Sequence, residues 1–108
     1  MLILARLVRG EDLVEGIEAL ARHHGLTHAI IRSGPGSLDQ GCVQAGSTPV
    51  EIPGPGAELL TLYGEVTAEG ATLHGTVGDP SGRVYAGRFV RGRNPVCITV
   101  ELTMEALP

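Results

Sequence analysis

The sequence predicts a single α+β domain in which one helix packs against a mostly antiparallel sheet. A helical period of apolar residues occurs once, near the N-terminus, whereas a period of two fills the second half of the chain. Glycine, proline, asparagine and aspartate separate the alternating segments, as tight turns require. The chain has 108 residues, 43% of them hydrophobic and 19% charged, so we expect one globular domain over residues 1–108.

The predicted helix follows a first strand over residues 2–8 and has a signal at each end. Apolar residues recur at helical spacing over residues 13–21. Asp12 precedes this run and Glu15 follows three residues later, which makes a capping pair at the N-terminus. Gly25 comes after three basic or titratable residues, so we expect the helix to stop there.

The segment between the helix and residue 57 predicts two strands and two loops. A strand is expected at residues 27–32, followed by a Ser-Gly-Pro-Gly-Ser loop at residues 33–37. Residues 38–45 predict a weaker strand. Residues 47–56 contain three prolines and two glycines, which suits a loop or an edge segment and excludes a helix.

The second half of the chain predicts consecutive antiparallel strands joined by short turns. They are expected at residues 58–67, 72–77, 83–90 and 96–104. In the first of these strands Leu60, Leu62 and Val66 are expected on one side, and in the last Val96, Ile98, Val100 and Leu102 alternate with Cys97, Thr99 and Glu101. Turns are expected at residues 79–82 and 92–95. One helix covers only part of such a sheet, so an apolar face remains for a partner subunit.

Charge and cysteine content restrict the classes of function. The net charge is −4 at pH 7, which argues against a duplex-binding domain because such domains need a basic face. Four arginines do fall within residues 83–93, and we interpret them as solvated strand ends and turns. Cys42 and Cys97 lie far apart, so we expect free thiols in a reducing, cytoplasmic location. The apolar run at residues 2–8 is too short for a signal or a membrane span.

Several short motifs, taken in order, resemble the plants-and-prokaryotes-conserved (PPC, or PCC) domain. The resemblance covers nearly the whole chain, and it is the order and spacing of the motifs that make it specific. They are Gly10-Glu11-Asp12-Leu13, Gly34-Pro35-Gly36-Ser37, the strand from Glu58 to Gly64, Leu73-His74, the segment from Gly82 to Gly92, and Thr99-Val100-Glu101.

The resemblance implies an antiparallel sheet of about seven strands with one main helix, assembled as a homotrimer. Only 3% of the chain is aromatic, so its core lacks large anchors, which agrees with extra burial between subunits. Prokaryotic relatives carry a histidine trio typical of a metal site. In this sequence Thr72 and Arg88 stand at two of the three positions and only His74 remains. Arginine cannot ligate a metal, so we expect no metal and no other cofactor.

If Thr72, His74 and Arg88 still converge, they present a hydroxyl, an imidazole and a guanidinium, a set that suits a small carboxylate or phosphate. Nearby backbone N–H groups of the glycine-rich loop would add donors. We therefore hypothesise an anion-binding pocket in an inter-subunit cleft. The alternative is that Arg88 forms a structural ion pair with Glu101 or Glu58. The candidate ligand-binding residues are Thr72, His74, Arg88, Glu101, Gly34, Gly36 and Ser37.

Two other functions remain as alternatives. One is an accessory, transcription-related domain that acts through protein partners. The other is a small hydrolase or lyase with His74 as base and Ser37 as nucleophile, although no motif assigns a catalytic residue. The Arg91-Gly92-Arg93-Asn94-Pro95 segment is similar to the minor-groove core of AT-hook proteins, which plant members of the family carry. It falls in an expected turn between strands, so direct nucleic-acid binding is not expected.

Overall fold

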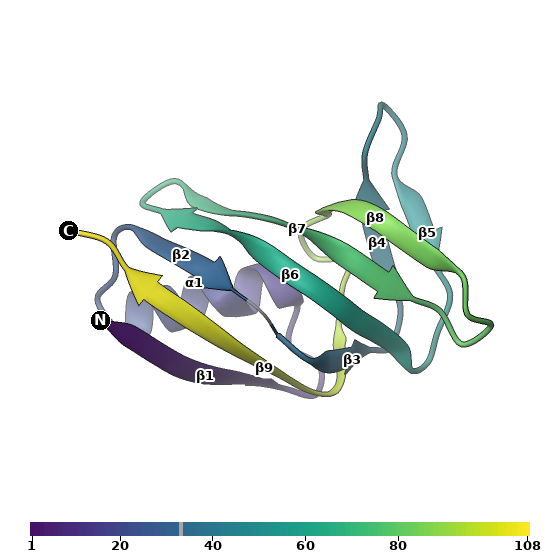
Figure 1. Cartoon of the computed structure of the whole chain (residues 1–108), viewed down its shortest axis with the longest axis horizontal. Helices are drawn as coiled ribbons and strands as arrows, with labels where there is room; N and C mark the ends of the chain where they lie inside the picture. The colour runs from purple at the N-terminus through teal and green to yellow at the C-terminus, as the bar shows by residue number, and fades with distance from the viewer. Residues whose placement is uncertain (33) are drawn as a thin grey trace.

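The computed structural model describes residues 1–32 and 34–108, and in this part of the chain one helix packs against a nine-stranded antiparallel sheet (Figure 1). Ser33, the first residue of the expected glycine-rich loop, lies outside the described residues. The elements in chain order are β1 (Leu2–Val8), α1 (Leu13–His23), β2 (Ala29–Arg32), β3 (Gly36–Leu38), β4 (Gly41–Gln44), β5 (Val50–Ile52), β6 (Ala57–Thr67), β7 (Gly70–Gly78), β8 (Val84–Phe89) and β9 (Val96–Ala106).

The strand order is β1-β9-β2-β6-β7-β8-β4-β5, with β3 paired to both β6 and β9. The α+β class and the antiparallel sheet are confirmed, but the expected number of about seven strands is wrong. Part of the glycine-rich loop is itself strand β3. A Cβ at Gly36 would lie 2.5 Å from the carbonyl oxygen of Thr99, so glycine lets β3 approach β9 closely enough to pair. The proline-rich stretch contributes β5, a three-residue edge strand.

Helix α1 begins and ends as its sequence predicts. The Asp12 carboxylate accepts hydrogen bonds from the backbone N–H groups of Val14 and Glu15, at 3.1 and 3.0 Å. Gly25 follows the helix with a φ of +67°, a conformation that suits glycine. The buried side of the helix packs into the core through Leu13, Val14, Ile17 and Ala21. Within the described chain, α1 is neither long nor apolar enough to cross a membrane.

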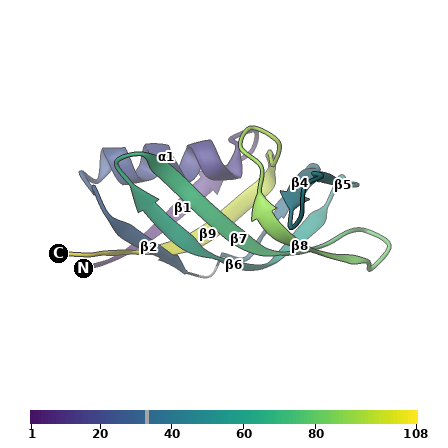
Figure 2. The ribbon, with the colours of Figure 1, turned by 90° about the horizontal axis from the view of Figure 1, so that it is seen from above.

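The two faces of the sheet differ, because α1 covers one face and leaves the other uncovered (Figure 2). We call the uncovered side the open face. The alternation predicted for residues 72–77 is confirmed on β7, where Leu73 and Val77 are buried in the core and Thr72, His74 and Thr76 point the other way. On the edge strand β1, Leu2, Leu4 and Val8 are exposed. The open face therefore combines a polar centre with an apolar edge.

Three local predictions are wrong, each because the sheet shifts its register or bends. In β6 the pairing with β7 slips at Leu60, so Leu59 is buried and Leu60 is 49% exposed. In β9 the pairing with β3 also shifts, and Ile98 is 70% exposed. The strand expected at residues 38–45 is divided by a bend at residues 39–40, which separates β3 from β4.

Candidate functional site

A row of polar side chains crosses the centre of the open face. The Cα partners along it are Arg32 and Tyr63, then Tyr63 and His74, then His74 and Arg88, and finally Arg88 and Gln44. Directly paired residues of antiparallel strands present their side chains on the same face as close neighbours. These five residues therefore form one continuous line across β2, β6, β7, β8 and β4, which we call the central row.

Two rings are stacked in the middle of the central row. The rings of Tyr63 and His74 have centroids 5.6 Å apart and an angle of 19° between their planes. Tyr63 is 58% exposed, whereas His74 is half-buried beside it. The Tyr63 ring covers the imidazole on its β6 side. A ligand can therefore reach His74 from solvent and from the side of Arg88 on β8.

Arg88 has no carboxylate of residues 1–32 or 34–108 at ion-pairing distance. At the other end of the row, Arg32 contacts Glu105 at 2.6 Å. The ion-pair alternative proposed from the sequence is wrong, because neither Glu101 nor Glu58 pairs with Arg88 among the described residues. Glu101 instead pairs with Arg6 at 2.9 Å, and β2, β6 and β7 lie between β9 and β8. The exposed guanidinium of Arg88 is therefore available to an external anion.

The other candidate residues are divided between two places. Thr72 lies on β7 two residues before His74, on the same face, opposite Glu65. Gly34, Gly36 and Ser37 lie on the other side of β6, beside β9.

Because β3 is sandwiched between β6 and β9, Gly36 and Ser37 belong to the sheet and lie away from His74 of the same chain. Glu101 is in the same group, since its backbone N–H donates to the carbonyl of Pro35 at 2.9 Å. Ser37 is likewise separated from His74 by β6, so the geometry gives no support to the pair of nucleophile and base.

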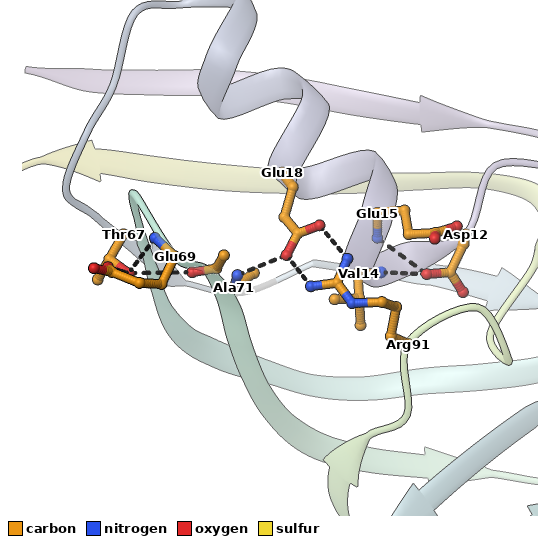
Figure 3. Close-up of polar contacts among 9 residues, drawn as sticks. Asp12, Val14, Glu15, Glu18, Thr67, Glu69, Ala71 and Arg91 are labelled. Atoms are coloured by element: carbon orange, nitrogen blue, oxygen red, sulfur yellow. Dashed lines mark hydrogen bonds and ion pairs between the residues drawn. The ribbon is translucent and has the colours of Figure 1, made fainter.

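Sequence reasoning missed the ion pair between Glu18 and Arg91, which lies on the helix side of the sheet (Figure 3). Both carboxylate oxygens of Glu18 accept hydrogen bonds from the Arg91 guanidinium, and one also accepts from the backbone N–H of Ala71 at 2.8 Å. The bonds from Arg91 hold the pKa of Glu18 below its ordinary value, and Glu18 in turn raises the pKa of Arg91. The sequence does contain a signal for this pair, because Glu18 is an acidic residue on the apolar side of the helix, between Ile17 and Ala21.

The arginine-rich segment at residues 91–95 forms a turn, as predicted. Gly92 has a φ of +78°, and the backbone N–H of Arg93 donates to the carbonyl of Val90 at 3.2 Å. Arg91 is bound to Glu18, and Arg93 contacts Glu51. This segment is fixed on the protein surface and does not extend as a free tail.

Comparison with known proteins agrees with this architecture. Residues 2–108 match the Plants and Prokaryotes Conserved (PCC) domain. A PPC protein from Pyrococcus horikoshii has a similar crystal structure, with a TM-score of 0.81 and 26% identity, over 100% of this chain and 80% of that chain. A structure titled "Putative DNA-binding protein" from Ralstonia eutropha shares the fold, with a TM-score of 0.81 and 20% identity over 97% of this chain and 77% of that one.

A longer protein also contains a similar segment. The "Bifunctional protein GlmU" of a Synechococcus strain is 32% identical over 107 residues, which make up 95% of this chain but only 16% of that protein. The similarity is thus confined to a small part of that relative. The family match and the antiparallel sheet with its single described helix lead to one conclusion: this chain belongs to the PCC domain family.

Proposed function

We propose that this PCC domain is a binding module that holds a small anion, a carboxylate or a phosphate, beside His74 and Arg88, and that it works as a homotrimer with this site in a cleft between subunits. The observation that supports the proposal is the Arg88 guanidinium, exposed on the open face and paired to no described carboxylate. An unpaired guanidinium next to an imidazole offers charge-assisted hydrogen bonds to an anion.

The neighbours of Arg88 support binding of an oxygen-rich anion. The fork of an arginine matches the two oxygens of a carboxylate or phosphate. His74 lies directly opposite Arg88, and the amide of Gln44 flanks it on β4. An imidazole and an amide can both donate a hydrogen bond to an anion. The site thus replaces the metal chemistry implied for relatives with anion binding, since a guanidinium cannot serve as a metal ligand.

Self-association is the second part of the proposal. The edge strand β1 exposes Leu2, Leu4 and Val8 along the open face, with exposed fractions of 62%, 78% and 52%. Covering these side chains in an interface would remove apolar surface from water, at about 25 cal/mol per Å². Light scattering coupled to size-exclusion chromatography tests the trimer: a monomer mass at micromolar concentration would remove this part of the proposal.

The anion site is tested by titrating acetate and inorganic phosphate into the isotopically labelled protein and following amide shifts. We expect saturable shifts in β7 and β8 around residues 74 and 88, and their loss in R88Q. Shifts that do not saturate, or that are unchanged in R88Q, would remove the anion-binding part while leaving the assembly part to the mass measurement.

A second candidate function is an accessory role in transcription. It is favoured by the fold shared with the Ralstonia protein that is described as a "Putative DNA-binding protein". The net charge of −4 and the ion pairs of Arg91 and Arg93 favour contact through a protein partner over direct contact with a duplex. Absence of a mobility shift with duplex DNA at low salt is the expected result, whereas salt-sensitive binding would favour direct DNA recognition instead.

A further inference from the structure

A hollow lies on the helix side of the sheet, away from the central row. It is formed between the C-terminal half of α1 and the turn that joins β6 to β7, and its volume is about 370 Å³. This is within the range of small-molecule pockets, which begins at roughly 300 Å³. We call it the helix-side pocket. Figure 3 shows the ion pair at one of its walls, with Glu18 reaching from the helix toward Arg91.

The floor of the helix-side pocket is apolar. Ala21 and Val66 are buried core residues that also line it, and Leu26 is half-buried beside them. Aliphatic carbon atoms of a ligand would therefore replace water at this floor with favourable contacts. The floor is small, so it fits a short aliphatic chain and not a large ring system.

One wall of the pocket carries two arginines, and Arg22 is the one that forms no ion pair among the described residues. Glu18 and Arg91 satisfy each other as a bidentate pair, while the Arg91 side chain stays 50% exposed. Arg22 lies one helical turn after Glu18, on the same side of α1, and its charge helps to lower the pKa of Glu18. Arg22 forms no ion pair with any carboxylate among the described residues. This wall thus carries two guanidiniums and the Glu18 carboxylate, and the second carboxylate of the pocket, Glu69, lies on the opposite wall.

The opposite wall is the β6–β7 turn, which is polar. The Glu69 carboxylate accepts a hydrogen bond from the Thr67 hydroxyl at 3.0 Å, and Glu69 also lines the pocket (Figure 3). A group that donates hydrogen bonds, such as an ammonium, would find an acceptor on this wall, across from the cations. The pocket therefore has a wall with two arginines, an apolar floor and a wall with a hydrogen-bond acceptor.

We infer that the helix-side pocket binds a short aliphatic carboxylate, whose carboxylate contacts Arg22 and the outer edge of Arg91 while its chain packs on Leu26 and Val66. A simple branched fatty acid and an aliphatic α-amino acid share this chemistry, and the second adds an ammonium that reaches Glu69. The site is separate from the anion site proposed at Arg88, since α1 and the central row are on opposite faces of the sheet.

The test uses isovalerate and L-leucine as probes, titrated into the labelled full chain and followed by amide chemical shifts. Saturable shifts are expected at residues 22, 26–27 and 66–71 with both probes. If Glu69 accepts the ammonium of L-leucine, L-leucine binds more tightly than isovalerate, and E69Q removes this difference in affinity. If isovalerate binds and L-leucine does not, the pocket is a site for simple carboxylates.

Variants complete the test. R22Q is expected to weaken binding about tenfold, the loss of one charge-assisted hydrogen bond, whereas R9Q, the same change at an exposed arginine outside the pocket, leaves binding unchanged. T27F places a ring at the pocket wall and should abolish the shifts without unfolding the protein. R88Q should leave this binding intact even where it abolishes acetate binding on the open face. Unsaturable shifts, or equal affinities for wild type and R22Q, overturn the inference.

Discussion

Tyr63 and His74 lie directly opposite each other on β6 and β7, and their stacked rings leave the imidazole accessible from the Arg88 side. Three strands thereby contribute to one polar surface, through residues that are 11 and 14 positions apart in the chain, from 63 to 74 and from 74 to 88. This surface is exposed, so its residues can be replaced with little effect on folding, and binding and stability can be measured separately.

The first prediction concerns Arg88. R88Q should reduce the affinity for acetate or phosphate at the open face about tenfold or more, because a glutamine amide lacks the charge of the guanidinium. The free energy of unfolding should change by no more than about 0.5 kcal/mol, since the side chain is exposed and unpaired. Amide-shift titration measures the first effect and urea denaturation the second. R9Q is the matched control; a similar loss of affinity in R9Q would indicate non-specific attraction of anions.

The second prediction concerns the Glu18–Arg91 pair and its dependence on pH. Arg91 holds the folded-state pKa of Glu18 below its ordinary value of 4.5, so the unfolded state binds a proton more readily than the folded state. The stabilisation from this pair is complete above pH 4.5 and is lost as the pH falls through the folded-state pKa. Urea denaturation at about pH 6 and about pH 3 should therefore show a larger drop in stability for wild type than for E18Q.

Removing Arg91 from this pair should lower the free energy of unfolding at neutral pH more than removing the charge of Glu18 does. R91A leaves the buried Glu18 carboxylate with the Ala71 N–H as its remaining hydrogen-bond donor, and we expect a loss of about 1–3 kcal/mol in the free energy of unfolding. The double variant R91A/E18Q removes the uncompensated charge and should recover part of that loss. No recovery in the double variant would mean that packing of the arginine side chain, and not charge, accounts for the effect.

The third prediction concerns Gly70, which lies at the start of β7. Its φ is +128°, and a Cβ there would lie 2.7 Å from Oε2 of Glu18. G70A should therefore destabilise the protein by about 1–3 kcal/mol through backbone strain and displacement of the carboxylate. Gly46 is the control, because a Cβ there meets nothing within 4 Å. Thermal or urea denaturation of G70A and G46A compares the two, and equal stabilities would contradict the explanation.

The fourth prediction concerns assembly through the open face. Leu4 is 78% exposed on β1, so L4E should leave the fold of one subunit intact. A glutamate at the proposed interface would have to be buried without a partner, and the trimer should dissociate. A19E, on the exposed side of α1, is the control and should keep the wild-type mass. Light scattering gives the masses, and a trimeric L4E would place the interface elsewhere.

Local sequence patterns predicted the elements that depend on local forces. Asp12 and Gly25 delimit α1 because capping and a left-handed backbone are properties of a few adjacent residues. The alternation in β7 was also predictable, since one face is buried and the other is open. Leu60 and Ile98 were assigned to the wrong side because a register shift depends on which strand pairs alongside, and alternation within one segment carries no such information.

Local sequence patterns also predicted only part of the candidate site. The family resemblance brought Thr72, His74 and Arg88 together, and the register of β7 and β8 places His74 and Arg88 opposite each other. Within one chain Glu101 and the glycine-rich segment lie apart from them, because β9 pairs with β1, β2 and β3 and not with its predecessor β8. Tyr63 was overlooked, although an exposed aromatic residue on a strand is a signal that sequence alone can give.

Asn94, at the end of the arginine-rich turn, influences the local unfolding of the protein. Its fully buried side chain accepts a hydrogen bond from the N–H of Cys42 and donates to the carbonyls of Cys42 and Val90, while its own N–H donates to the Asp12 carboxylate that caps α1. One amide therefore couples the helix start, the turn and β4. In native-state hydrogen exchange, the amides of Cys42 and Asn94 should exchange together as one cooperative unit, and both should become faster in N94A.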